Sequence, residues 1–216
     1  MDLATVDKLL TTTRTVRKRL DLDRPVPRTV IEECLNIAIQ APTGSNAQGW
    51  HFLVITDAVK RAKIGKLYKK SFFIYARAGQ EEASQSDAPT QPDSQMMRVV
   101  NSAVYLANNM HRVPVMIIPC IEGRAEHGSP MNQAGLYGSI LPATWSLMLA
   151  LRARGLGAAW TSLHLRYEPE IAELLGIPPH LTQAALLPIA YFLGDDFKPA
   201  KRMPATEVTS WEQWQK

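Results

Sequence analysis

Apolar residues recur along the chain with two spacings, and these predict helices separated by short strands. A first helix is expected after its N-cap, Asp2, because apolar residues recur on one face: Leu3, Val6 and Leu10. A second helix is expected from Pro27, with an apolar stripe at helical spacing: Val30, Cys34, Leu35 and Ala38. Residues 51–56, HFLVIT, predict a strand.

The middle of the chain predicts two further helices around a polar stretch. Asp57 would cap a helix whose charged positions indicate a solvated face: Lys60, Arg61, Lys63, Lys66, Lys69 and Lys70. Residues 79–94 are polar, hold two prolines and are too long for an ordinary connection, which leaves a linker or a mobile lid. Apolar positions at helical spacing follow: Met97, Val100, Val104 and Ala107.

The second half alternates strands with helices. Residues 113–121, VPVMIIPCI, predict a strand, in which Pro119 indicates an edge or a bulge. A long helix is expected from about Gln133 to Arg154, where Pro142 marks a kink or an offset start. Glycines 155 and 157 would end it. A strand (158–165), a short helix (168–175) and a buried strand (184–194) are then expected.

About four strands separated by helices predict an α+β or α/β layered fold. The 216 residues suffice for one substantial core, and the chain shows no internal repeat. We therefore expect a single domain over residues 1–216, with a candidate lid at 79–94.

Composition narrows the class of protein. The chain is 46% hydrophobic and 20% charged, an ordinary soluble composition, and it has no uninterrupted apolar run of about 18 residues. Its first residues lack an apolar signal core, so we expect a cytoplasmic protein that makes no membrane contact. Cys34 and Cys120 lie in apolar stretches and are expected to be buried free thiols, and the scattered histidines predict no metal site.

The sequence contains no self-sufficient catalytic set of side chains. What remains is three polar clusters: Arg14 to Arg19, Thr43 to Gln48, and a third formed by Lys198, Lys201 and Arg202. The basic clusters are either solvated surface or they converge on one phosphate, which arginine binds bidentately. The net charge of +4 suits a small anionic ligand as well as it suits nucleic acid.

The segment APTGSNAQGW, residues 41–50, adds weight to the ligand interpretation. Hydroxyl and amide side chains alternate there with small residues, which suits the edge of a flat heteroaromatic ligand. The alternative is an ordinary turn in which Asn and Ser bond to their own backbone. Trp50 would anchor the segment in either case.

The chain resembles the FMN-dependent nitroreductase superfamily over nearly its whole length. Four segments carry the resemblance, in family order: Arg14-Thr15-Val16-Arg17 with Pro25-Val26 following, Ala41 to Trp50, Leu149 to Gly157, and Lys201-Arg202-Met203-Pro204. Each motif is weak alone, but four in the right order are strong. Gly49 replaces the family's usual Pro, and Thr43 its usual Ser.

The resemblance implies a central mixed or antiparallel sheet flanked by helices, in a domain-swapped type of homodimer with FMN at the interface. It implies that NADPH or NADH passes a hydride to flavin N5. The electrons then reach a small-molecule substrate, namely a nitroaromatic, quinone or activated-alkene acceptor, by a ping-pong route. The flavin carries the chemistry, so no catalytic side chain is expected.

The resemblance also implies which residues bind the cofactor. Arg14, Arg202 and Lys201 would hold the phosphate. The cation near flavin N1 and O2 is Lys18 if Arg14 matches the family's first arginine, or Arg17 if Thr15 matches its serine. We favour Arg17. The remaining implied contacts are Pro42, Thr43, Asn46 and Gln48 from the other subunit, Ser139, and the backbone at Thr161, Ser162 and Leu163.

Two other functions stay open. A reductive dehalogenase, deiodinase-like or flavin-modifying enzyme would use the same fold, with Glu81, Glu82 and Asp87 in the candidate lid. A binder of flavin or nucleic acid without enzymatic activity is a different class. The basic run is not interleaved with aromatic residues, and we therefore expect no nucleic-acid partner.

Overall fold

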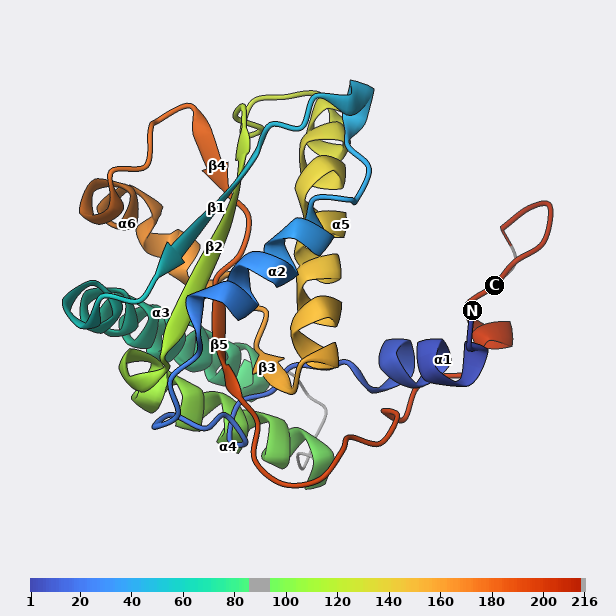
Figure 1. The fold of residues 1–216 in the computed structure, drawn as a ribbon, viewed down its shortest axis with the longest axis horizontal. Helices are drawn as coiled ribbons and strands as arrows, with labels where there is room; N and C mark the ends of the chain where they lie inside the picture. Colours follow the sequence, from blue (N-terminus) through green and yellow to red (C-terminus); the bar gives the residue numbers. More distant parts are fainter. Residues whose placement is uncertain (86–93, 215–216) are drawn as a thin grey trace.

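The centre of the protein is a five-stranded sheet whose named strand pairs are all antiparallel. The computed structural model describes residues 1–85 and 94–214, and Figure 1 shows this sheet with helices packed around it. The strands are β1 (Trp50–Ile55), β2 (Val115–Glu122), β3 (Leu156–Ala158), β4 (Leu181–Gln183) and β5 (Leu187–Tyr191). The order is β1-β2-β5-β3, and β4 also pairs with β2. The predicted layered fold with a helix-flanked sheet is confirmed.

Six α-helices are described, and two of them begin at the capping residues that the sequence predicts. They are α1 (Leu3–Thr12), α2 (Arg28–Ala38), α3 (Ala58–Gln85), α4 (Ser94–Asn109), α5 (Pro130–Ala153) and α6 (Glu168–Leu175). Asp2 accepts a hydrogen bond from the Thr5 N–H (3.3 Å), and Asp57 accepts one from the Lys60 N–H (2.8 Å). Both predicted caps therefore satisfy backbone donors that a helix start leaves open.

The central strand β2 is buried on both faces, which explains its continuous apolar run. Val115 and Ile117 belong to a core that includes residues of α2 and α5. Met116 and Ile118 point the other way, into a core with residues of α3, α4 and α6. The sheet therefore separates two apolar cores, and β2 contributes alternate side chains to each.

Pro119 does not lie on a sheet edge, so the predicted edge position is wrong. β2 pairs with β1 from Met116 to Ile121, and on its other side it pairs with β5 up to Ile117 and with β4 from Cys120. The Pro119 carbonyl accepts a hydrogen bond from the Ala184 N–H at 2.9 Å. The Pro119 nitrogen, which has no hydrogen to donate, faces the same side of β2, where β5 and β4 leave a gap between them. A proline is tolerated there because no ladder hydrogen bond is lost.

Helix α5 continues through Pro142, and it ends before Gly155, whose φ of 75° is left-handed. Among the described helices it is the one long and apolar enough to cross a membrane by length and composition. Seven of its residues pack into the protein's own core: Ile140, Ala143, Thr144, Leu147, Met148, Ala150 and Leu151.

One other expectation needs correction. The strand expected over 158–165 stops at Ala158, because the chain bends into a 3-10 turn at Leu163–Tyr167. Helix α1 lies beside the C-terminal segment at the periphery in Figure 1, and Leu3 and Leu10 on its apolar face are exposed. Of the candidate lid, residues 79–85 extend α3 and residue 94 begins α4, whereas 86–93 lie outside the described residues.

Candidate functional site

The Arg-rich segment runs alongside β3 and is held there by backbone contacts. The Val16 N–H donates to the Ala158 carbonyl (2.9 Å), and Thr15 forms a parallel bridge with Ala158. Val16 is buried against Gly157, where a Cβ would come within 2.9 Å of the Val16 Cβ. Gly157 lies in β3 and does not end the preceding helix. Its role is to let the Arg-rich segment pack closely against β3.

Arg17 and Lys18 have different surroundings. Arg17 is half-buried, and its Nη1 donates to the Ser102 Oγ of α4 at 3.3 Å. Burial lowers the pKa of the Arg17 guanidinium, and the nearby Tyr68 partly offsets that shift. An arginine keeps its charge under such a shift, so a positive group is held partly out of water here. Lys18 is exposed to solvent.

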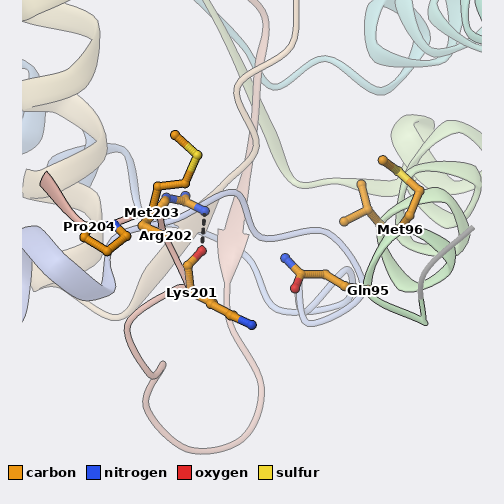
Figure 2. Close-up of a pocket in the computed structure, with 7 residues that line it drawn as sticks. Gln95, Met96, Lys201, Arg202, Met203 and Pro204 are labelled. Carbon is orange, nitrogen blue, oxygen red and sulfur yellow. Dashed lines mark hydrogen bonds between the residues drawn. The ribbon is translucent and has the colours of Figure 1, made fainter. Parts of the chain in front are cut away.

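The third basic cluster lies next to the Arg-rich segment. Arg14 Nη1 donates to the Lys198 carbonyl at 3.1 Å, which links the segment to the C-terminal tail. Farther along, the tail and α4 border a cavity of about 650 Å³ that is open to solvent, lined by Gln95, Met96, Val99, Lys201, Arg202, Met203 and Pro204. Figure 2 shows the tail residues on one side of this cavity and Gln95 and Met96 on the other. Two cations and several apolar side chains therefore border one space of small-molecule size.

Thr161 and Ser162 follow β3. The Thr161 N–H donates to the Leu186 carbonyl (3.2 Å), and the Leu186 N–H donates back to the Thr161 carbonyl (2.8 Å). The Leu163 N–H is directed at the Thr161 Oγ1 at 3.4 Å. Two of the three backbone donors expected to face a flavin thus have partners within the chain. Ser162 is exposed.

The amide loop is backbone-strained. Ser45, Asn46 and Gln48 have φ values of 51°, 52° and 53°, in the left-handed region that costs a residue with a Cβ about 1 kcal/mol or more. Within the loop, the Gln48 N–H donates to Thr43 Oγ1 (3.1 Å) and its side-chain amide donates to Asn46 Oδ1 (3.2 Å). Such clustered strain is typical of functional loops.

Ser139 contacts the amide loop. Its Oγ accepts from the Gly44 N–H (3.0 Å) and donates to the Gly135 carbonyl (2.7 Å). A Cβ on Gly44 would lie 3.3 Å from that oxygen, so the absence of a side chain permits this approach. The structure thus brings Ser139 together with the loop residues Pro42, Thr43, Asn46 and Gln48.

The candidate residues form two separate groups within one chain. One group lies around β3 and the tail: Arg14, Thr15, Arg17, Lys18, Thr161, Ser162, Lys201 and Arg202. The other is the amide loop with Ser139. Figure 1 shows the loop beside one end of α5 and β3 beside the other. Ser139 and the last residue of α5 are 14 positions apart, about 20 Å along a helix.

Sequence reasoning missed Tyr68 and Ser102. Tyr68 of α3 is only 3% exposed. Burial raises the pKa of its phenol, and Thr161 and Arg17 partly offset that rise. Its position in the sequence continues an apolar stripe with Ile64 and Phe72, which indicates a core residue and nothing more. The interaction with Arg17 joins segments distant in sequence, so periodicity gave no signal for it.

Comparison with known proteins identifies the fold and the family. Residues 10–191 match the Nitroreductase family model. Two solved structures share the fold: an iodotyrosine deiodinase bound to FMN and 3-iodo-L-tyrosine (TM-score 0.73, 20% identity, 97% of this chain and 100% of that one) and an FMN and NADPH-dependent nitroreductase from sphigopyxis sp. strain HMH (TM-score 0.66, 20% identity, 96% and 99%).

Characterised relatives fall into two groups by name. A 4-nitrobenzoate reductase from Nocardioides sp. is 25% identical over 205 residues, covering 86% of this chain and 79% of the relative. An NADH dehydrogenase from Thermus thermophilus is 26% identical over 202 residues, covering 87% of each. Iodotyrosine deiodinase 1 from Rattus norvegicus is 25% identical over 167 residues, covering 77% of this chain and 55% of the relative. The family match spans most of the chain, which therefore belongs to the Nitroreductase family of oxidoreductases, as the sequence motifs predict.

Proposed function

We propose that this protein is an FMN-dependent NAD(P)H oxidoreductase that reduces nitroaromatic, quinone or activated-alkene acceptors. The observation that carries the proposal is Arg17, a cation held partly out of water beside β3 in a chain of this family. The names of the relatives support the reaction class, because they include a nitrobenzoate reductase and an NADH dehydrogenase.

The donor set suits the phosphate of FMN. Arg14 is tied to the tail at Lys198, and the tail then presents Lys201 and Arg202 to the cavity of about 650 Å³. Guanidinium groups bind phosphate oxygens through paired, charge-assisted hydrogen bonds. Met96 and Val99 on the opposite wall offer apolar surface to the rest of a ligand. The residues present therefore fit the cofactor that the family resemblance implies.

Arg17 would stabilise the reduced form of the cofactor. When bound, FMN would accept two electrons and a proton from NADPH or NADH and deliver them to the acceptor in a second half-reaction. A fixed cation near the ring edge stabilises the negative charge that reduction creates, and it acts strongly where water is partly excluded. Arg17 fits this role better than the exposed Lys18. The chain's own residues would bind and orient, with no side chain acting as a general acid or base.

We also propose that the working unit is a homodimer. The amide loop and the basic clusters lie toward opposite ends of α5 within one chain, so a single copy does not surround one flavin with both groups. A second copy placed by two-fold symmetry would bring its loop residues Pro42, Thr43, Asn46 and Gln48, with Ser139, to the first copy's Arg17. The strain at Asn46 and Gln48 fits a loop shaped for such a contact.

A deiodinase-like reaction is the second candidate. It is supported by the deiodinase relatives and by the TM-score of 0.73 to an iodotyrosine deiodinase. Of the acids in the candidate lid, Glu81 pairs with Arg77 on its own helix (2.9 Å). The side chains of Glu82 and Asp87 lie outside the described part of the chain. The nitroreductase reaction stays first because Glu81, the lid acid whose side chain is described, is not among the residues that line the cavity.

An anaerobic titration tests both candidates. The purified protein, supplied with FMN, would be titrated with NADPH and separately with NADH while absorbance is followed over the flavin band. A nitroaromatic would then be added, and 3-iodotyrosine in a parallel sample. Bleaching that a nitroaromatic reverses without oxygen supports the first proposal. Reversal by iodotyrosine with release of iodide supports the second, and the absence of FMN binding would overturn both.

A further inference from the structure

The C-terminal tail is attached to the rest of the chain at Phe197, shortly before its cations reach the cavity. The Phe197 ring is partly buried and packs against the ring of Phe192, with the two centroids 4.9 Å apart. The guanidinium carbon of Arg19 lies 4.1 Å from the centroid of the Phe197 ring, and that of Arg152 lies 5.1 Å from it. Both distances fall within the range of cation–π attraction. The ring is therefore held by Arg19 of the Arg-rich segment and by Arg152 near the end of α5.

Asp196 fixes the backbone next to this ring. Its carboxylate pairs with Lys8 of α1 at 2.7 Å and with Arg152. It also accepts a hydrogen bond from the Phe197 N–H at 2.9 Å. The side chain of Arg152 is only 13% exposed, so its pairing with Asp196 is partly shielded from water. Asp196 thus joins α1, α5 and the tail, and it supplies a negative charge beside the two arginines.

Backbone contacts with the Arg-rich segment lie on both sides of Phe197. Before it, Arg19 Nε donates to the Leu193 carbonyl (2.6 Å), and the Leu193 N–H donates to the Arg19 carbonyl (2.8 Å). After it, Arg14 Nη1 donates to the Lys198 carbonyl (3.1 Å). The course of the tail around Phe197 is therefore set by the same segment that carries Arg17.

The two cations of the tail have little else to hold them. Lys201 and Arg202 are exposed at one side of the cavity, as Figure 2 shows. Within residues 1–85 and 94–214, the hydrogen bond described for these two residues joins Arg202 Nη1 to the Lys201 carbonyl (3.3 Å). Four residues of chain span at most about 14 Å, so a fixed Phe197 confines Lys201 to the neighbourhood of the cavity.

We propose that Phe197 is a positioning residue: its ring, seated between Arg19 and Arg152, holds Lys201 and Arg202 beside the phosphate of FMN. This inference rests on the proposed function. A flavin without a phosphate makes no use of these two cations. Loss of the aromatic ring would therefore weaken the binding of FMN more than the binding of riboflavin.

The test compares two substitutions at one position. Phe197→Leu keeps an apolar side chain but removes the ring face, whereas Phe197→Tyr keeps the ring. Flavin fluorescence gives the affinity of each apoprotein for FMN and for riboflavin. We expect Phe197→Leu to bind FMN about tenfold more weakly than wild type, the scale of two cation–π contacts, and to bind riboflavin as wild type does. Phe197→Tyr should restore FMN affinity.

Trypsin provides a second measurement that needs no flavin. The enzyme cleaves after Lys201 and after Arg202, and a released tail reaches it more readily. Phe197→Leu apoprotein should therefore lose the tail several-fold faster than wild type, and Phe197→Tyr should not. Cleavage at the wild-type rate in Phe197→Leu would overturn the anchoring role.

Asp196→Asn tests the anchor if Phe197→Leu does not fold. It removes the charge that pairs with Lys8 and Arg152, and it should cause the same selective loss of FMN affinity. Glu32→Gln is the matched control, because it removes an exposed acid that pairs with Arg28 on its own helix. An equal loss of FMN affinity in Glu32→Gln would overturn the inference.

The outcomes separate this inference from the proposed function. If wild type binds FMN and Phe197→Leu binds it equally well, the anchor is wrong and the flavin enzyme stands. Equal weakening of FMN and riboflavin would also overturn the anchor, because the effect would then not involve the phosphate. A wild-type protein that binds no FMN overturns the proposed function and this inference with it.

Discussion

Gly157 and Val16 are packed so closely that the glycine has no room for a methyl group. A Cβ on Gly157 would lie 2.9 Å from the Cβ of Val16. The Val16 N–H also donates a hydrogen bond to the carbonyl of Ala158, the residue after Gly157, at 2.9 Å. Val16 is β-branched and cannot turn its bulk away easily. The spacing between the Arg-rich segment and β3, and with it the position of Arg17, depends on this glycine.

Gly157→Ala should therefore displace the Arg-rich segment. We expect a loss of about 1–3 kcal/mol in the free energy of unfolding, the usual scale for overpacking a core, together with weaker FMN binding. Denaturant unfolding and FMN titration measure the two effects. Gly79→Ala is the control, since a Cβ at that helical position meets nothing within 4 Å and alanine favours a helix. Equal stability of Gly157→Ala and wild type would contradict the packing argument.

Arg17→Ala and Lys18→Ala distinguish the two possible registers of the Arg-rich segment. Arg17 is half-buried and bonded to Ser102, whereas Lys18 is exposed. We expect Arg17→Ala to weaken binding of reduced FMN by about 1.5–3 kcal/mol, the scale of a charge-assisted hydrogen bond, and Lys18→Ala to change it little. Fluorescence titration under anaerobic, reducing conditions gives both affinities. A larger effect at Lys18 would favour the other register.

Arg202→Ala addresses the phosphate end of the cofactor. Removing one of the cations beside the cavity should loosen oxidised FMN by about 1.5–3 kcal/mol, and riboflavin, which lacks the phosphate, should be affected much less. Equilibrium titration with FMN and with riboflavin measures this difference. Arg28→Ala, an exposed arginine paired with Glu32, is the control. Unchanged FMN affinity in Arg202→Ala would show that the tail does not bind the phosphate.

The sequence was most informative where structure is local. The caps Asp2 and Asp57 and the left-handed Gly155 mark helix ends through contacts within a few residues, so the pattern alone located them. The amide loop was also recognisable, since hydroxyl and amide residues next to glycines carry a chemical signal without any knowledge of the fold.

Structural features that depend on contacts between distant segments could not be predicted from the local sequence pattern. The edge position considered for Pro119 was wrong because its tolerance depends on the gap between β4 and β5, which exists only once both strands pair with β2. Tyr68 looked like core because its spacing from Ile64 and Phe72 is helical, and only in the folded chain does its phenol interact electrostatically with Arg17. The sequence likewise does not show that the amide loop lies at one end of α5 and the basic clusters at the other, because that separation depends on the folded positions of both.

His164 predicts a loss of stability in acid. The residue is fully buried, neither ring nitrogen has a hydrogen-bond partner among the described residues, and burial lowers its pKa from 6.5 to about 3. Between these values the unfolded chain binds a proton that the folded chain does not. The free energy of unfolding therefore falls as pH drops below 6.5, by at most about 5 kcal/mol near pH 3.

Urea unfolding of the wild type and of His164→Phe at about pH 7.5 and about pH 4.5 measures this effect. The variant should lose less stability than the wild type over that interval, because it has no imidazole to protonate on unfolding. Parallel curves for wild type and His164→Phe would mean that His164 is not buried in its neutral form.

Mixed dimers provide the sharpest test of a site shared between subunits. Arg17→Ala and Asn46→Ala alter the two groups that lie apart within one chain. If each flavin site takes Arg17 from one subunit and Asn46 from the other, each homodimer of a single variant carries two defective sites. A heterodimer of the two variants would carry one site with both changes and one site with neither.

Random pairing of equal amounts makes half of the dimers heterodimers, so about a quarter of all sites would regain wild-type FMN affinity. Co-expression with two different affinity tags isolates the heterodimer, in which one tight FMN per dimer is expected. The double variant Arg17→Ala/Asn46→Ala, co-expressed with wild type, is the complementary case: each heterodimer site then carries one change, and no tight site should remain. If the heterodimer of the two single variants has no tight site, the shared site is wrong: Arg17 and Asn46 would then act on a flavin bound by one chain.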